Sequence, residues 1–119
     1  MDIAIHKAIA AVVPNCYGTV APPEAVAPYA VWQRLGGEDT EYLDAEDAPQ
    51  VSKVQIQVRI FSADVLEPKT LMKSLTDAFR SDDALVIRPI GKWRDDYDYD
   101  MNLFVADQDY EAIGYDSLI

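Results

Sequence analysis

The sequence is poor in the residue types that build cross-linked or metal-bound frameworks. Its 119 residues include one cysteine, Cys16, and one histidine, His6. A single cysteine excludes an internal disulfide, and a standard zinc site is not expected without further ligands of these types. No apolar run approaches the roughly 20 residues that a membrane-spanning helix needs. The first stretch, MDIAIHKAIAAVVP, lacks the basic leader of a signal peptide.

Basic residues are also scarce. Ten lysines and arginines stand against 21 aspartates and glutamates, which leaves a net charge of −11. Such a surface repels nucleic-acid phosphates and anionic membranes, and it suits either a basic protein partner or simple solubility. Hydrophobic residues make up 50% of the chain. This supply is enough for one core, so we expect a single domain over residues 1–119.

The hydrophobic periodicity predicts an α+β fold. Apolar residues recur at helical spacing near the start of the chain and again after residue 67, and strand-like patterns occupy most of the remainder. We therefore expect a mostly antiparallel sheet of about four to five strands with two helices packed on one face. The predicted elements are a helix that ends before Pro14, an extended connection over 16–28, strands over 28–37 and 51–62, a helix over 67–81, and strands over 84–94 and 101–115.

Segment 51–62 has the clearest strand pattern, because apolar and polar residues alternate along it. One face carries Val54, Ile56, Val58 and Ile60, and the other carries Gln55, Gln57 and Arg59. The helix over 67–81 can cover the apolar face with a stripe of Leu71, Leu75, Ala78 and Phe79. Pro89 removes one hydrogen-bond donor from the strand over 84–94, which predicts an edge position or a bulge there.

Single aromatic and titratable residues give weaker indications. Trp32 and Trp93 both fall in predicted strands, so both are expected in the core. His6 lies on the polar side of the first helix and is expected to be solvated. Cys16 lies in a proline-rich stretch with no nearby basic group except Lys7 and His6, which predicts a buried or neutral thiol.

The stretch DDYDYD, residues 95–100, holds four aspartates and two tyrosines in six positions. Its aspartates partly fit the spacing of a calcium-binding EF-hand loop, but Met101 stands where that loop requires glycine. In an extended backbone Asp96, Asp98 and Asp100 share one face, and both tyrosines share the other. Solvated carboxylates of this kind are poor candidates for acid/base catalysis. The stretch is therefore predicted to be the end of a β-hairpin.

The remaining motifs give no sign of an enzyme. The double glycine at 36–37 is followed by acids, which is the wrong charge for cradling a phosphate. No nucleophile elbow, P-loop or dinucleotide fingerprint occurs. No catalytic residue, cofactor site or metal site is predicted. The run EDTEYLDAED, residues 38–47, holds six acids in ten positions and is expected to be a solvated loop or hairpin tip.

Three stretches, taken in order, resemble a known family. They are PYAVWQRLGG (28–37), VQIQVRIFSADVLEPKTLMKSLTDAF (54–79) and DDYDYDMNLFVADQDYEAI (95–113). Together they are similar to the small tail-completion, or tail-terminator, proteins of long-tailed bacteriophages and prophages, over about residues 3–113.

This resemblance implies a structural role in virion assembly. Proteins of the family have an α+β fold and act at the head-proximal end of the tail, after assembly in the bacterial host cytoplasm. They form a homo-oligomeric ring, commonly a hexamer, on the last ring of tail-tube protein. The ring stops tube polymerisation and offers a surface for the head-completion or connector protein.

Two groups of residues are candidate contact sites on this basis. Gln55, Gln57 and Arg59 lie on the sheet face opposite the helices and suit a hydrogen-bonded protein interface, a wet channel wall or an ordinary solvated face. The acidic loop would face the ring's channel or contact a partner through Glu38, Asp39, Glu41, Asp44, Glu46 and Asp47. Reversing these charges is expected to impair infectivity or DNA release. The alternative hypothesis is an acidic binding module, such as a DNA mimic that occupies a basic site on a partner protein.

Overall fold

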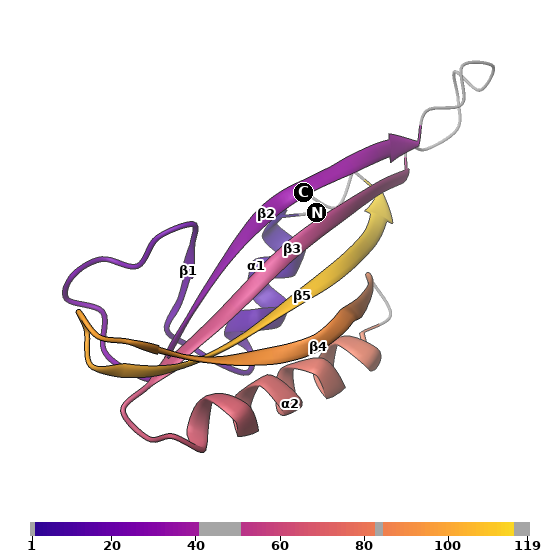
Figure 1. Ribbon diagram of the computed structural model, residues 1–119. Helices are drawn as coiled ribbons and strands as arrows, with labels where there is room; N and C mark the ends of the chain where they lie inside the picture. Colours follow the sequence, from indigo (N-terminus) through magenta and orange to yellow (C-terminus); the bar gives the residue numbers. More distant parts are fainter. Residues whose placement is uncertain (1, 41–50, 83–84, 116–119) are drawn as a thin grey trace.

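The computed structural model describes residues 2–40, 51–82 and 85–115. Within these ranges the elements follow in the order α1 (Asp2–Ala10), β1 (Cys16–Gly18), β2 (Tyr29–Thr40), β3 (Val51–Ser62), α2 (Glu67–Arg80), β4 (Val86–Asp98) and β5 (Leu103–Tyr115) (Figure 1). The strands form one sheet in the order β1-β2-β3-β5-β4, and only the β1–β2 pair is parallel. The predicted α+β class is confirmed.

β3 occupies the centre of the sheet, with one face apolar and the other polar, and the two faces are as its alternating sequence predicts. Its four alternating aliphatic side chains are Val54, Ile56, Val58 and Ile60, and all four are buried. Each fully buried side chain of this size contributes roughly 1.5–3 kcal/mol to stability. The strand bounds match the predicted segment 51–62, because a strict period of two allows only one assignment of faces.

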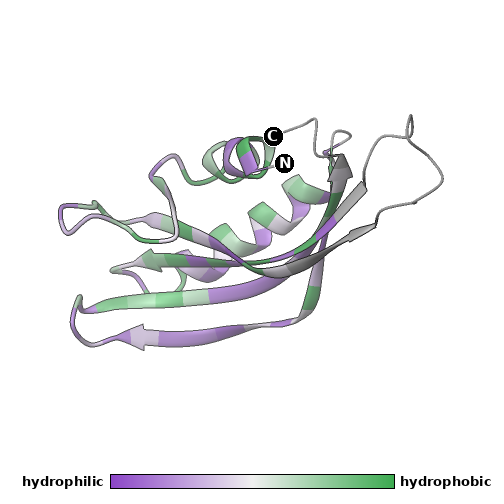
Figure 2. Cartoon of the chain, turned by 90° about the horizontal axis from the view of Figure 1, so that it is seen from above, coloured by the Kyte–Doolittle hydropathy of each residue, from purple (hydrophilic) through white to green (hydrophobic). Residues whose placement is uncertain are grey.

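Both helices pack on the apolar side of the sheet (Figure 2). Ile5 and Ile9 of α1 join the same core as Leu75 and Phe79 of α2. Pro68 lies in the first turn of α2, as predicted. The predicted apolar stripe needs one correction: Met72 is fully buried, whereas Leu71 and Ala78 are half-buried. Met72 lies three residues before Leu75 on the same side of the helix. The buried stripe is therefore rotated slightly from the predicted one, toward Met72.

The N-terminal half of the sheet differs from the prediction in two places. Residues 16–18, expected to be part of an extended connection, form β1 and pair in parallel with residues 30–32. β2 does not end at the double glycine but continues to Thr40. The register shifts between Arg34 and Gly36, whose φ of 146° suits glycine. Gly36 therefore borders a β-bulge, Gly37 pairs regularly with Val54, and the double glycine does not end the strand.

β4 lies at the edge of the sheet, which confirms the position that Pro89 predicted. It extends further than expected, to Asp98, and its register shifts between Ile90 and Arg94. Three residues of β4 there stand opposite one residue of β5, Gln108. Gly91 enters this bulge with a φ of 69°, a left-handed conformation that favours glycine.

A second apolar cluster lies on the sheet face that the helices leave uncovered. Tyr29, Phe61 and Val105 are its buried members, and the rings of Tyr29 and Phe61 stack at 4.8 Å. Alanines of the connection between β1 and β2, among them Ala21 and Ala25, pack against it. The connection therefore covers one end of the sheet face that carries no helix. Less of that face is exposed than the placement of both helices on the other side would suggest.

The two tryptophans have different environments. Trp32 is buried, as predicted, and its indole Nε1 donates a hydrogen bond to Nδ1 of His6 at 3.0 Å. His6 is therefore held at the edge of the core, and the prediction of a solvated histidine was wrong. Trp93 is 45% exposed, so its predicted core position was also wrong. It lies in the β4 bulge, where the alternation of faces breaks down.

Cys16 is half-buried, and burial raises the pKa of its thiol to about 11. The prediction of a neutral thiol is confirmed. In the described part of the chain, neither helix is long and apolar enough to cross a membrane.

Candidate functional site

The sheet face opposite the helices is the most prominent surface that remains partly uncovered. We call it the open face and define it by the outward residues Gln33 of β2, Gln55, Gln57 and Arg59 of β3, Asp107, Asp109 and Glu111 of β5, and Arg88, Ile90 and Arg94 of β4. All of them are exposed or half-buried. The face thus combines amides, carboxylates and guanidinium groups on a rigid sheet.

The predicted candidates on β3 do lie on this face. Gln55 is exposed, and Gln57 and Arg59 are half-buried. Gln33 Nε2 donates a hydrogen bond to Gln57 Oε1 at 3.3 Å. The guanidinium carbon of Arg59 lies 5.1 Å from the centre of the Phe61 ring. These contacts orient the row but leave hydrogen-bonding capacity for a partner.

β5 contributes a row of carboxylates that the sequence analysis did not single out. Arg94 pairs with Asp107 and approaches Asp109 at 3.4 Å. The hydrogen bond and the charge of Asp107 raise the pKa of Arg94. Lys53 Nζ lies 2.9 Å from Glu111. The carboxylates of β5 thus stand between cations supplied by the strands on either side.

This row could have been found in the sequence. Asp107, Asp109 and Glu111 alternate with apolar or neutral residues, the same period-two signal that identified β3. What the sequence could not supply is the position of the neighbouring cations, since their placement depends on the strand order.

The open face suits protein binding better than catalysis or DNA mimicry. Its carboxylates are paired with arginine and lysine, so they do not present a continuous row of free negative charge as a phosphate backbone does. Ile90 is 40% exposed and Val86 is 53% exposed along the β4 edge. Apolar side chains beside amides and paired charges resemble the mixed composition of non-obligate protein interfaces.

The DDYDYD stretch lies where the sequence placed it, at the β4–β5 hairpin. Asp98 Oδ1 accepts hydrogen bonds from the backbone N–H groups of Asp100 and Met101, at 3.0 and 3.1 Å. This carboxylate therefore organises the turn. Tyr97 and Tyr99 contact each other edge to face at 4.9 Å. No group of three acidic, cysteine or histidine residues able to hold a metal ion occurs among the described residues.

Only two of the six acidic residues in the predicted acidic loop belong to the described ranges. Glu38 and Asp39, expected in a loop, lie in β2 and pair in register with Lys53 and Ser52 of β3. The other four predicted residues, Glu41, Asp44, Glu46 and Asp47, lie outside the described residues.

Comparison with known proteins gives a clear result. A family model described as Tail completion protein gp17 matches residues 4–115. A solved structure described as "Virion of native gene transfer agent (GTA) particle" contains a chain with a similar fold, at a TM-score of 0.56 and 13% identity. That match covers 90% of this chain and 84% of the other. No curated protein sequence matches. The family match confirms the resemblance expected from the three sequence stretches.

Proposed function

Because this chain belongs to the tail completion protein gp17 family, and is thus a structural, non-enzymatic virion component, we propose that it ends tail-tube polymerisation. In this proposal copies of the chain form a ring, commonly of six, on the head-proximal end of the tube. The ring then joins the tail to the head-completion or connector protein. The protein is assembled in the bacterial cytoplasm and remains at that position in the virion.

The observation that carries this proposal is the open face. A single layer of helices covers one side of the sheet, and the other side offers amides, paired charges and exposed aliphatic side chains. A terminator must bind the last ring of tube subunits through a surface that is fixed in shape before contact. A twisted sheet meets that need, since its backbone is held by a continuous hydrogen-bond ladder.

We assign the contact with the tail tube to the centre of the open face. Gln55 and Gln57 can each donate and accept hydrogen bonds, and Arg59 is half-buried against Phe61, which limits the entropy lost on binding. The connection between β1 and β2 covers the second apolar cluster, so it sets one end of the proposed contact with the tail tube.

The test measures binding of the purified protein to preformed tail tubes by co-sedimentation. We expect binding to saturate at one ring per tube, at the head-proximal end. The variant Gln55→Arg/Gln57→Arg should weaken binding by about tenfold or more, because two added cations must be desolvated at the contact. The matched control is Ala63→Arg/Ser74→Arg, which adds the same charge at two exposed positions away from the open face.

Two results would contradict the proposal. One is binding along the whole tube wall in proportion to tube length, which describes a coat and not a cap. The other is an open-face variant that binds tube ends as tightly as the wild type while the control variant loses binding.

A further inference from the structure

A basic groove lies between α2 and β4, on the side of the molecule away from the open face. It encloses about 540 Å³. Four of the chain's ten basic residues line it, against one acid, Asp77. The four are Lys69, Lys73, Arg80 and Lys92. In a protein with a net charge of −11, this is a strong local separation of charge.

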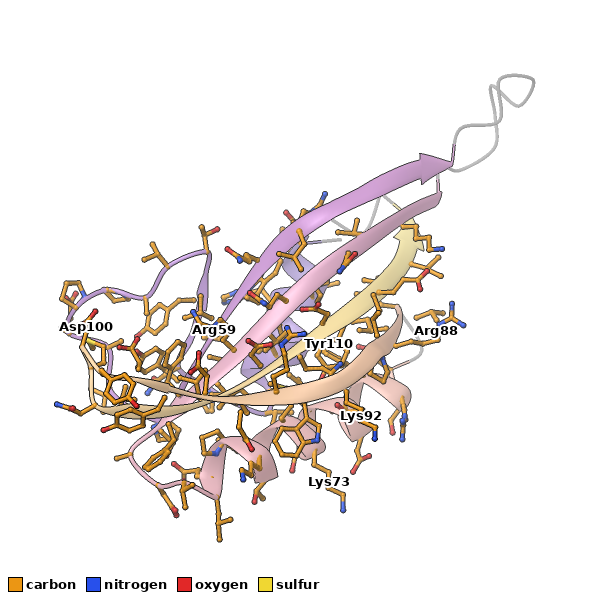
Figure 3. All side chains as sticks on the ribbon, viewed as in Figure 1. Arg59, Lys73, Arg88, Lys92, Asp100 and Tyr110 are labelled. Atoms are coloured by element: carbon orange, nitrogen blue, oxygen red, sulfur yellow. The ribbon has the colours of Figure 1, made fainter. Side chains whose placement is uncertain are left out.

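The β4 bulge creates this groove. Gln108 is buried, and its Nε2 donates to the backbone oxygens of Ile90 and Gly91 at 3.1 and 3.3 Å. The bulge held in this way directs Lys92 and Trp93 toward α2, where they line the groove. Figure 3 shows Lys92 of β4 and Lys73 of α2 projecting on the same side of the molecule.

The cations of the groove are largely uncompensated. Lys69 lies 3.3 Å from Asp95 and 5.7 Å from the centre of the Trp93 ring. Lys73, Arg80 and Lys92 form no ion pair within the described ranges 2–40, 51–82 and 85–115. Clustered like charges repel one another, so an anionic partner would relieve this repulsion. Trp93 adds an exposed aromatic surface beside the cations.

We propose that the groove receives the acidic segment 38–47 of a neighbouring copy and that this contact links copies of the chain around the ring. The inference rests on the proposed function and specifies how the ring closes. The contact joins two different surfaces, as a closed ring of more than two copies requires.

The chemistry of the segment matches the groove. EDTEYLDAED carries six acids and no basic residue, and it includes an aromatic and an aliphatic residue, Tyr42 and Leu43, whose chemistry suits a surface of lysines beside an exposed tryptophan. A nucleic acid is a weaker candidate, because the whole molecule would repel it.

A neighbouring copy is favoured over the chain's own segment. The chain leaves β2 at Thr40 and re-enters the sheet in β3 at Val51. In Figure 1 these strand ends project away from the body of the molecule. Both β3 and β5 stand between β2 and β4 in the sheet, which separates β2 and β4 by about 14 Å.

The test is charge exchange in the full-length protein, with self-association measured by sedimentation velocity over a concentration series. The groove variant is Lys73→Glu/Lys92→Glu, and the segment variant is Asp44→Lys/Glu46→Lys. Each should weaken association by about tenfold or more, and salt should weaken association of the wild type. The matched control, Lys7→Glu/Arg34→Glu, makes the same change in charge at exposed positions outside both the groove and the open face.

Rescue identifies the contact. An equimolar mixture of groove and segment variants should recover association, because each altered groove meets an altered segment. A chain that carries both changes should recover it alone. Thermal melting of each variant separates a lost contact from a lost fold.

Four results would overturn the inference. The first is a wild type that stays monomeric at every concentration, and the second is normal association of the groove and segment variants. The third is rescue in the doubly altered chain but not in the mixture of the two variants. The fourth is that charge reversal in the groove abolishes binding of a DNA oligonucleotide but leaves self-association unchanged. Tube binding by the wild type is measured in parallel. If the wild type binds tube ends while the inference fails, the proposed function stands, whereas a wild type that never binds them contradicts the function itself.

Discussion

At the scale of single residues, Tyr110 connects the sheet to α2. Its side chain is fully buried, and its hydroxyl lies 2.7 Å from Thr76 Oγ1 and 3.3 Å from Met72 Sδ. Its ring meets Phe79 edge to face at 5.0 Å. Burial raises the pKa of Tyr110 to about 12. One side chain therefore combines packing, a hydrogen bond and a titratable group in the core.

Tyr110→Phe tests these roles together. At about pH 8 we expect the variant to be less stable by roughly 1 kcal/mol, through loss of the buried hydrogen bond. An unfolded tyrosine ionises near pH 10, whereas Tyr110 keeps its proton up to about pH 12. The wild type therefore has its full stability below pH 10 and loses roughly 2 kcal/mol from this group as the pH rises to about 12.

The measurement is urea unfolding of both proteins from about pH 8 to 12. The order of stability should reverse, with the variant the more stable of the two near pH 12. A stability difference that stays constant across this range would show that Tyr110 ionises equally in the folded and unfolded states. Ionisation of Cys16 and the other tyrosines affects both proteins and cancels in the comparison.

A second prediction at the scale of single residues concerns Asp98. Asp98→Ala should lower the free energy of unfolding by about 1 kcal/mol, because the backbone N–H groups of residues 100 and 101 lose their acceptor. Asp98→Asn keeps an acceptor oxygen and should cost less. Asp100→Ala, in the same turn, is the matched control. Equal effects at both aspartates in thermal melts would rule out a specific turn contact.

Single residues were also where the sequence was least informative. Trp32 and Trp93 are the same residue type in predicted strands, yet one is buried and the other is exposed. His6 has a polar side chain on a polar helix face, but Trp32 reaches it from a strand distant in sequence. Both outcomes depend on contacts between elements, which local periodicity does not encode.

At the scale of elements, the β4 bulge shapes both the edge of the sheet and the basic groove. The bulge spans residues 91–93 and contains Gly91 in a left-handed conformation. Opposite it, the Gln108 amide donates hydrogen bonds to the backbone oxygens of Ile90 and Gly91, where the regular ladder is interrupted.

Gln108→Leu should destabilise the protein by about 1–3 kcal/mol, because the backbone oxygens of Ile90 and Gly91 lose the donor that the buried Gln108 amide supplies. Urea unfolding measures the loss. Hydrogen exchange should locate it, with faster exchange around residues 91–94 than elsewhere in β4. The control is Gln33→Leu on the open face, which removes a hydrogen bond between two partly accessible amides. A larger loss for the control than for Gln108→Leu would contradict this role.

Elements with a long, regular pattern were predictable. β3 and α2 were identified with nearly their observed bounds, since twelve alternating residues and a strongly amphipathic helix leave little ambiguity. β1 was missed because three residues carry no period, and its partner strand begins more than ten residues later. The double glycine was misinterpreted because a bulge and a strand end share the same local signal.

At the scale of the whole molecule, two surfaces lie on opposite sides of one sheet. The open face offers neutral amides and paired charges, and the groove offers four cations beside an aromatic ring, three of them without an ion pair among the described residues. We infer that the two surfaces have different roles: the open face binds the tube, and the groove binds the neighbouring copy. Neither surface could be assembled from the sequence alone, since each combines residues from strands whose order becomes known only in the fold.

The measurement that tests this account most directly is the length of tail tubes that grow from purified tube protein, with and without this protein, imaged by electron microscopy. The account predicts that growth stops at the end that carries a ring of this chain, and that tubes shorten as its concentration rises. Tubes that grow to the same length, with no added density at either end, would contradict the account.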